Sequence, residues 1–144
     1  MVLKVTTDEQ ILATRDVMRQ LQPNVPFDQY LAIVKRMKQT DGYQLAALYD
    51  KDTVRAVAGY RVMEMLHYGR IMYNDDLNTD ERYRSKGYGK VLLDWLKVEA
   101  RALGCGHLHL DSGVERKQTH RFYFREGLTI NCYHFHMTLD RADG

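Results

Sequence analysis

A glycine-rich turn with basic residues stands near the middle of the sequence, where residues 84–90 read Arg-Ser-Lys-Gly-Tyr-Gly-Lys. A strand-like segment precedes it and a long amphipathic helix pattern follows it. The first N–H groups of a helix lack partners within it and lie at the positive end of the helix dipole, so they favour a phosphate. Gly87 and Gly89 carry no Cβ and let the backbone approach such a ligand closely. The turn therefore predicts a pyrophosphate site, to which positive charge is added by Arg84, Lys86 and Lys90.

Three better-known phosphate motifs do not fit these residues. A P-loop requires Ser or Thr after its Gly-Lys pair, and here Gly89-Lys90 is followed by Val91. A dinucleotide-binding fingerprint requires a third glycine at the position of Leu92. A kinase glycine loop lies between two strands, whereas this turn opens a helix. On the residues alone, a tight turn that binds nothing stays open as the alternative.

The hydrophobic periodicity of the chain predicts the elements that must position this turn. Alternation predicts strands, a 3.6-residue period predicts helices, and hairpin spacing makes the three central strands antiparallel neighbours. Both prolines fall in one break, Pro23 to Pro26. The expected strands cover 3–6, 43–49, 53–66, 70–79, 107–110 and 129–139, and the expected helices cover 7–20, 28–39, 87–103 and 115–125. This order predicts a mixed α/β fold with helices on both faces of a mixed sheet.

Composition limits the classes of protein to which the chain can belong. Its 144 residues have the size of one domain, 1–144, and a hydrophobic fraction of 44% allows a sizeable core. A formal charge of +2, with acidic and basic residues mixed, argues against a nucleic-acid binder. No apolar stretch approaches the roughly 20 residues of a membrane span. The N-terminus lacks a signal-peptide pattern, so we expect a cytoplasmic protein without a membrane partner. The His and Cys spacings indicate no metal site.

Two segments resemble one known family. Residues 84–89 resemble the Arg/Gln-x-x-Gly-x-Gly/Ala motif of the GCN5-related N-acetyltransferases (GNAT), and residues 74–83 resemble the strand and loop before it. Residues 122–128, Phe-Tyr-Phe-Arg-Glu-Gly-Leu, are similar to the family's Phe-Tyr-x-x-x-Gly-Phe. The order of elements matches the family across nearly the whole chain. The resemblance implies a single GNAT-type domain, mixed α+β, with a mostly antiparallel sheet of about six to seven strands.

The resemblance also implies acetyl-CoA as the cosubstrate and no metal. In this family the pyrophosphate sits on the backbone amides of the turn, and the pantetheine arm lies along the preceding strand as an added strand would. A backbone N–H near Leu77 or Asn78 would polarise the thioester carbonyl. Asn78 and Thr79 stand where the family has apolar residues, and Leu128 replaces the final Phe; neither departure changes a backbone contact. The implied cofactor-binding residues are Leu77, Asn78, Thr79, Arg84, Ser85, Lys86, Gly87, Tyr88, Gly89 and Lys90.

Direct acetyl transfer requires a neutral amine and a proton for the departing thiolate. Tyr123 matches the family's common general acid, and the pKa of a phenol lies near that of a thiol; a packing role for its ring is the alternative. For the base, Asp75 and Asp76 are adjacent on one strand, so alternation would point only one of them into the cleft. Glu64 on the neighbouring strand is a third candidate and water a fourth. A merely solvated carboxylate is the alternative for each.

The resemblance implies a primary amine as acceptor without identifying it. By resemblance, the Pro23–Pro26 loop and the 129–139 strand would line its site. Two other classes stay open: a non-catalytic acyl-CoA-binding regulatory module on the same fold, and a protein-interaction domain whose turn binds no nucleotide. A homodimer is also left open.

Overall fold

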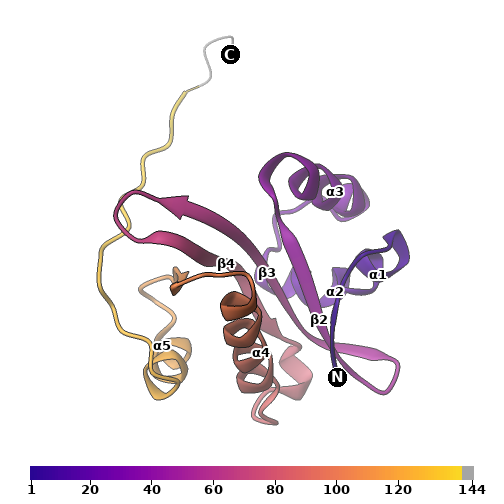
Figure 1. Ribbon diagram of the computed structural model, residues 1–144. Coiled ribbons are helices and arrows are strands. Elements are labelled where there is room, and N and C mark those ends of the chain that lie inside the picture. The colour runs from indigo at the N-terminus through magenta and orange to yellow at the C-terminus, as the bar shows by residue number, and fades with distance from the viewer. Residues whose placement is uncertain (141–144) are drawn as a thin grey trace. The chain divides into compact units, whose positions relative to one another are not determined.

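The computed structural model describes residues 1–140, in two compact units with their boundary between Leu110 and Asp111. The first unit is built on a five-stranded sheet in the order β1-β2-β3-β4-β5 (Figure 1). Neighbouring strands are antiparallel except for β5, which runs parallel to β4. The strands are β1 Val2–Lys4, β2 Gln44–Asp50, β3 Thr53–Met65, β4 Gly69–Thr79 and β5 His107–Leu110. The mixed, mostly antiparallel sheet is confirmed, with five strands in the described residues where six to seven are expected.

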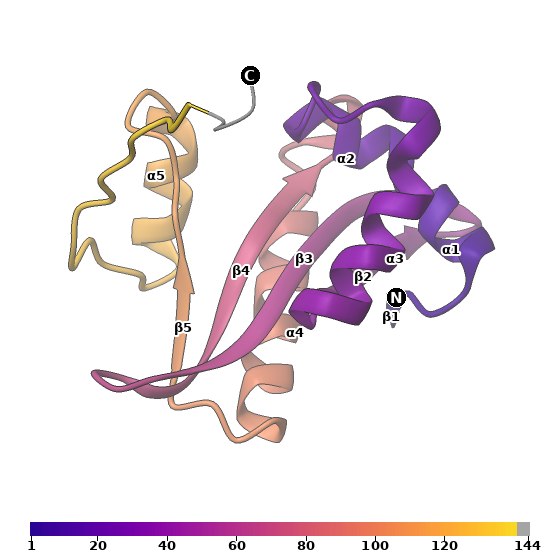
Figure 2. The same cartoon turned by 90° about the horizontal axis from the view of Figure 1, so that it is seen from above.

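Helices cover both faces of this sheet, as expected (Figure 2). α1, α2 and α3 lie on one face and α4 on the other. Their bounds are α1 Asp8–Ala13, α2 Arg15–Leu21, α3 Tyr30–Asp41 and α4 Tyr88–Ala102, with a 3-10 turn, η1 Phe27–Gln29, before α3. Leu92, Leu93 and Leu96 fix α4 on the sheet, since each is fully buried and contributes about 1.5–3 kcal/mol. In the described part of the chain, no helix is both long and apolar enough to cross a membrane.

The first expected helix is divided in two at Thr14. The Thr14 hydroxyl donates to the Ile11 carbonyl at 2.6 Å and lies 2.8 Å from the Tyr30 hydroxyl. Such a bond to the preceding turn bends a helix, and α2 then packs on β3 and β4. Thr7 is the N-cap of α1, where its hydroxyl accepts the Gln10 N–H at 3.1 Å in a capping box.

A β-bulge interrupts the pairing of β3 with β4. Gly59 lies opposite Asp76, whereas the next residue of β3, Tyr60, lies opposite Asn74. Asp75 is therefore an extra residue on β4. A bulge breaks the strict alternation of side chains and bends the strand that carries it.

β4 extends well past the end of its partner β5. Their parallel pairing ends at Asn74 and Leu110, while β4 continues to Thr79. Figure 2 shows the two strands diverging beyond the paired stretch. Within the described residues, the backbone of 75–79 thus has an unpaired edge on this side, with which another extended chain can form hydrogen bonds.

Over residues 111–140, the second unit contains one helix, α5 Lys117–Arg125, and an extended segment after Gly127. The strand expected over 129–139 is wrong, because residues 129–140 form no strand in the structure. Alternating apolar residues make a strand only where a neighbour completes the backbone hydrogen bonds, and none of the described strands pairs with this segment. Its exposed apolar side chains are Ile130, Tyr133, Phe135, Met137 and Leu139.

Candidate functional site

The glycine-rich turn joins β4 to α4 after a second 3-10 turn, η2 Glu81–Tyr83. Ser85 and Gly87 have left-handed backbone, with φ of +70° and +82°, and Gly87 is the N-cap of α4. No side chain caps this helix, and its first turn contains no acidic residue. No group in the described residues accepts the N–H of Gly87, Tyr88 or Gly89. The N-terminus of α4 is therefore open to an anion.

Gly87 is required by this backbone and also leaves space beside it. Its φ lies in a region that side-chain-bearing residues rarely adopt. A Cβ built at this position would meet no atom within 4 Å. The glycine is thus not explained by crowding within the protein, and the open space beside it fits a turn that a ligand approaches.

Two contacts hold the turn region on the sheet. The Tyr88 hydroxyl donates to Asp50 Oδ2, at the end of β2, at 2.9 Å. The Arg55 guanidinium lies 3.7 Å from the centre of the Tyr83 ring, and its buried Nε has no hydrogen-bond partner in the described residues. Arg55 therefore adds a positive charge near the turn. It is not predicted from the sequence, because it lies on β3, far from the motif along the chain.

The three basic side chains of the turn differ in their contacts. Arg84 Nη2 lies 3.5 Å from Asn78 Oδ1, so this side chain reaches back to the end of β4. Lys86 is exposed. Lys90 Nζ lies 3.0 Å from Asp94 Oδ2, one turn further along α4. Among the residues that the structure describes, no carboxylate forms an ion pair with Arg84 or Lys86, so these two charges of the turn are not offset.

A buried carboxylate, Asp80, organises the chain before the turn. Its Oδ2 accepts from Arg82 Nη2 at 2.8 Å, and its Oδ1 accepts the Arg82 backbone N–H at 3.1 Å. Gln20 of α2 holds the next residue, since its Oε1 accepts the Glu81 N–H at 2.9 Å. The hydrogen bonds from Arg82 lower the pKa of Asp80 to about 2, so this carboxylate is ionised at neutral pH.

We expect Asp80→Asn to lower the free energy of unfolding by about 2 kcal/mol at neutral pH, because the Arg82 donors lose a charged acceptor. The folded-state pKa lies below the ordinary 3.8, so the stabilisation is complete above a pH of about 4 and is lost as the pH falls towards 2. Melting curves of the parent and the variant across this range measure the effect. Glu81→Gln, which removes an exposed carboxylate next to it, is the control. A difference in Tm that stays constant down to a pH of about 2 would contradict the assignment.

The residues expected to hold the thioester lie at the end of β4, in the stretch with the unpaired edge. Leu77 and Thr79 are half-buried, and Asn78 is buried. Asn78 Nδ2 donates to the Val17 carbonyl at 3.0 Å. This bond ties β4 to α2 and accounts for a polar residue at the position. The turn 84–90 follows after η2, so the predicted cofactor residues all lie in the first unit, between the end of β4 and the start of α4.

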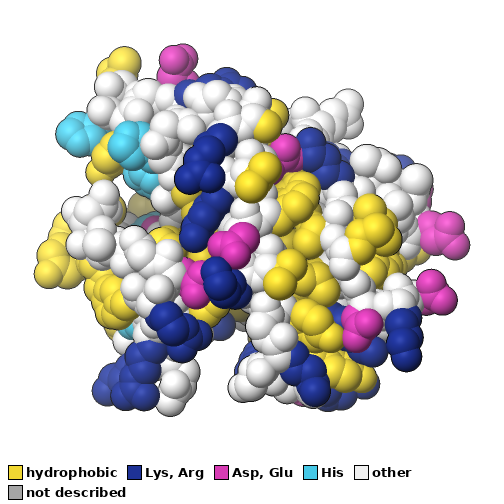
Figure 3. Space-filling model, turned by 60° about the horizontal axis from the view of Figure 1, so that its bottom comes forward, with side chains coloured by type: hydrophobic (Ala, Val, Ile, Leu, Met, Phe, Trp, Pro, Cys, Tyr) yellow, Lys and Arg dark blue, Asp and Glu magenta, His cyan; other side chains and the backbone are white. Residues whose placement is uncertain are grey.

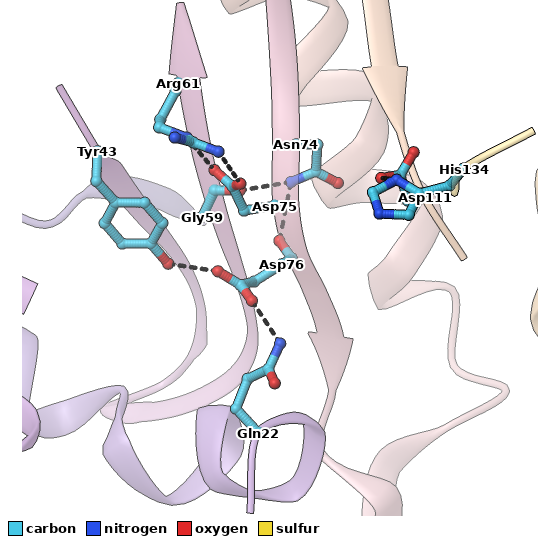
Figure 4. Close-up of polar contacts among 9 residues, drawn as sticks. All are labelled: Gln22, Tyr43, Gly59, Arg61, Asn74, Asp75, Asp76, Asp111 and His134. Atoms are coloured by element: carbon cyan, nitrogen blue, oxygen red, sulfur yellow. Dashed lines mark hydrogen bonds and ion pairs between the residues drawn. The ribbon is translucent and has the colours of Figure 1, made fainter. Parts of the chain in front are cut away.

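Asp76 lies at the centre of a polar cluster (Figure 4). The Tyr43 hydroxyl donates to its Oδ2 at 2.7 Å, and Gln22 Nε2 donates to its Oδ1 at 2.9 Å. Gly59 makes room for this arrangement, because a side chain at 59 would collide with the Tyr43 ring and hydroxyl. Burial raises the pKa of Asp76 above its ordinary value, and the two hydrogen bonds oppose that rise. Asp76 is thus a stronger proton acceptor than an exposed aspartate.

Asp75 is held by an arginine on the neighbouring strand. Arg61 Nε and Nη2 donate to its two carboxylate oxygens at 2.9 and 2.7 Å (Figure 4). Arg61 stands two residues after Gly59 on β3, so both face the same side of the sheet. Asp75 and Asp76 therefore lie on that one side, and the charge of Asp75 adds to the rise in the pKa of Asp76. The expectation that alternation separates the two carboxylates is wrong, because Asp75 is the extra residue of the bulge.

The buried Asn74 side chain forms hydrogen bonds with the backbone on both strands of the bulge. Its Nδ2 donates to the carbonyl oxygens of Gly59 and Asp76, both at 2.8 Å. These bonds satisfy carbonyls beside the irregular pairing and fix the backbone that carries both carboxylates. Neither Asn74 nor Tyr43 nor Arg61 is predicted as a site residue, because their roles depend on the register of β3 against β4.

Glu64 lies away from this cluster. It is exposed and lies opposite Arg70 near the hairpin between β3 and β4. It stands five residues along β3 from Gly59, which corresponds to roughly 16 Å of strand. Of the three acidic candidates, Asp75 and Asp76 are thus the two at the bulge.

The described residues contain no group of three or more His, Cys, Asp or Glu side chains that could hold a metal ion. Charge on the surface is mixed in sign. In the view of Figure 3, Lys and Arg side chains stand at several places, with carboxylates and apolar side chains between them.

Tyr123 belongs to the second unit, in α5. Its ring lies 5.4 Å from that of Phe122. Burial raises the pKa of the phenol above its ordinary value, and the charge of Arg116 opposes that rise. Among the described residues, none forms a hydrogen bond with the hydroxyl. Its phenol is therefore kept protonated to higher pH without being tied to a structural partner.

The chain matches the model of the acetyltransferase (GNAT) family over residues 12–127. It is 36% identical over 133 residues to the uncharacterized N-acetyltransferase YhdJ of Bacillus subtilis (strain 168), which covers 92% of this chain and 94% of that protein. It is also 36% identical over 93 residues to the aminoalkylphosphonate N-acetyltransferase of Salmonella typhimurium, which covers 65% of this chain and 60% of that protein.

Among solved structures, the fold is similar to that of aminoglycoside N-acetyltransferase AAC(6')-Iy in complex with CoA. The TM-score is 0.83 at 15% sequence identity, and the match covers 96% of this chain and 93% of that one. At this level of identity the likeness concerns the fold.

Proposed function

The chain belongs to the acetyltransferase (GNAT) family, and from that premise we propose that it transfers the acetyl group of acetyl-CoA to a primary amine by direct attack. The observation that carries the proposal is the open N-terminus of α4, which follows the unpaired end of β4 in the first unit. Together they offer an anion site next to a strand edge.

In this proposal the turn 84–90 binds the pyrophosphate through its backbone. Three features support this: N–H groups without acceptors at Gly87, Tyr88 and Gly89, a left-handed backbone at Gly87, and empty space beside that glycine. Positive charge from the turn and from Arg55 favours the same anion.

The unpaired edge of 75–79 receives the pantetheine arm as an added strand. Acetyl-CoA supplies the electrophile, its thioester carbonyl carbon. The backbone N–H near Leu77 or Asn78 donates to the carbonyl oxygen as negative charge develops there. The backbone at Asn78 is held in place, because its side chain donates a hydrogen bond to the Val17 carbonyl.

Asp76 is the general base in this proposal. It takes a proton from the acceptor ammonium, and the neutral nitrogen then attacks the carbonyl carbon. A raised pKa brings Asp76 closer to the pKa of an amine, while the hydrogen bonds from Tyr43 and Gln22 orient it. Asp75 is committed to Arg61 and acts as a positioning residue.

Tyr123 is the general acid in this proposal. As the carbon–sulfur bond breaks, its phenol gives a proton to the departing thiolate. The attacking nitrogen loses its second proton, which returns through water to the phenolate and restores the phenol. The products are the N-acetylated amine and CoA, and Asp76 releases its proton to solvent. Burial raises the pKa of Tyr123, which keeps the phenol protonated at the pH where the amine is deprotonated.

We expect Asp76→Asn and Asp75→Asn to differ. Asp76→Asn should lower kcat/KM by about 10²-fold, because an amide cannot accept the proton. In the parent, kcat/KM should fall at low pH with a midpoint above 3.8, the ordinary pKa of an aspartate, because the pKa of Asp76 is raised. This fall should be absent in the Asp76→Asn variant. Asp75→Asn should mainly lower the Tm, since it breaks the bidentate pair with Arg61. Profiles of kcat/KM against pH for both variants test this, and equal, negligible losses would exclude both residues as the base.

The decisive experiment for the reaction is a panel of amines scored by acetyl-CoA-dependent release of thiol. Small alkylamines, amino acids, aminoglycosides and peptides belong in the panel, as do aminoalkylphosphonates, the class named for the Salmonella relative. Calorimetric titration with CoA runs beside it. Binding of CoA without thiol release from any amine favours a regulatory module, and absence of CoA binding removes the basis of the proposal.

A further inference from the structure

Two arginines of α2 stack on one aromatic ring. The Arg15 guanidinium lies 3.9 Å from the centre of the Phe27 ring, and that of Arg19 lies 4.8 Å from it. The two residues are one helical turn apart and therefore point from the same face of α2. Stacking uses the flat faces of the guanidinium groups and leaves their N–H edges free to donate.

Neither arginine is neutralised within the described structure. No carboxylate of the described residues forms an ion pair with Arg15 or Arg19. The Nε of Arg15 is buried and has no hydrogen-bond partner there. Two like charges one turn apart repel each other, and a buried donor without an acceptor is unfavourable. An anion bound between the two side chains would relieve both costs.

The arginine pair lies next to the carboxylate that we propose as the base. Both arginines line a small, partly open hollow together with Phe27, Gln22 and Tyr30, with room for about one water molecule in its enclosed part. The same Gln22 donates to Asp76 Oδ1 at 2.9 Å, and Figure 4 shows its side chain reaching Asp76 from the end of α2. A single glutamine side chain thus separates the hollow from Asp76.

We propose that the amine acceptor carries a phosphonate or phosphate group, which Arg15 and Arg19 bind while the amine lies at Asp76. This inference rests on the proposed acetyl transfer. Two guanidinium groups match the double negative charge of the group and donate to its tetrahedral oxygens. Because one glutamine side chain spans the separation, the acceptor is a short molecule, with only a few bonds between its amine and its phosphorus.

The test compares acceptors of similar length that differ in their far end. These are 3-aminopropylphosphonate, O-phosphoethanolamine, 4-aminobutyrate and n-butylamine. We expect kcat/KM for the phosphonate or the phosphate ester to exceed that for n-butylamine by about 10²-fold or more. Comparison of the two phosphorus compounds shows whether the enzyme prefers a phosphonate or a phosphate ester. The aminobutyrate tests whether a carboxylate is sufficient.

Arg15→Gln and Arg19→Gln should each reduce this preference. We expect the ratio of kcat/KM between the preferred phosphorus compound and n-butylamine to fall by about 10-fold or more in each variant. The loss should appear in KM rather than kcat, because the arginines hold the acceptor and do not touch the reacting atoms. Arg36→Gln, on an exposed position of α3, is the matched control and should leave the ratio unchanged.

Two results would overturn the inference and leave acetyl transfer standing: a parent enzyme that acetylates n-butylamine as well as the phosphorus compounds, or a preference for them that survives both substitutions. If no amine releases thiol, the proposed function fails. The anion site is then tested separately, by measuring the binding of a phosphonate. Methylphosphonate titrated calorimetrically into the parent and into the double variant Arg15→Gln/Arg19→Gln provides that measurement. Binding lost only in the double variant supports the site, and equal heats in both proteins overturn it.

Discussion

Gly89→Asp should abolish binding of CoA and, with it, all acetyl transfer. Gly89 lies in the first turn of α4, next to N–H groups that have no acceptor in the described structure. An aspartate there would place a side chain and a negative charge where the pyrophosphate has to lie. Loss of a multidentate anion site is expected to weaken binding by about 10³-fold or more. Calorimetric titration of CoA into both proteins measures the loss directly.

The same substitution should not harm the fold. A carboxylate in the first turn of a helix interacts favourably with the helix dipole, so the Tm of the ligand-free variant should equal or exceed that of the parent. CoA should raise the Tm of the parent and leave that of the variant unchanged. Gly106→Asp is the control, since a Cβ at 106 meets nothing within 4 Å and its φ is not left-handed. A folded Gly89→Asp variant that binds CoA with the parent's affinity would remove the basis of the proposed function.

The turn and α4 are predictable from the sequence because their signals are local. The glycines, the basic residues and the apolar period all lie within one stretch, 84–103. The prediction gives the helix to within one residue at each end, since Gly87 is its N-cap and Leu103 its C-cap. Secondary structure of this kind is decided by neighbours in the chain.

The carboxylate cluster is only half predictable, because its geometry depends on contacts distant in sequence. Adjacent Asp75 and Asp76 are visible as candidates, but alternation gives the wrong orientation once a bulge lies between β3 and β4. The position of the bulge is set by the pairing of two strands, and no residue pattern in β4 marks it. Arg61 and Tyr43, which divide the roles of the two carboxylates, come from other strands.

In segment 129–139 the local pattern predicts a strand that does not form. Its alternating apolar side chains are a strong strand signal, yet the described structure gives it no strand partner and leaves those side chains exposed. The pattern records which residues prefer a half-buried sheet position, while the hydrogen bonds that create the strand must come from elsewhere. A prediction from one segment cannot supply that second strand.

Tyr123→Phe should lower kcat by about 10²–10⁴-fold while leaving the affinity for acetyl-CoA unchanged. The substitution removes only the hydroxyl, and the ring keeps its place beside Phe122. The hydroxyl makes no hydrogen bond to a described residue, so the Tm should barely change. Since burial raises the pKa of Tyr123, the high-pH limb of the parent's kcat profile should lie above the ordinary value of 10.0, and this limb should disappear in the variant.

The matched control is Tyr49→Phe, which removes a half-buried phenol at the end of β2, where the ring packs against the core of the first unit. If Tyr123 donates the proton, only its own substitution lowers kcat. The loss should be largest for amines with which departure of the thiolate is the rate-limiting step. A packing role predicts the reverse pattern, in which the Tm falls slightly and kcat stays within a few-fold of the parent. That reverse pattern would assign proton delivery to water or to another group. It would leave the rest of the mechanism intact, because binding at the turn and proton removal by Asp76 do not depend on the phenol.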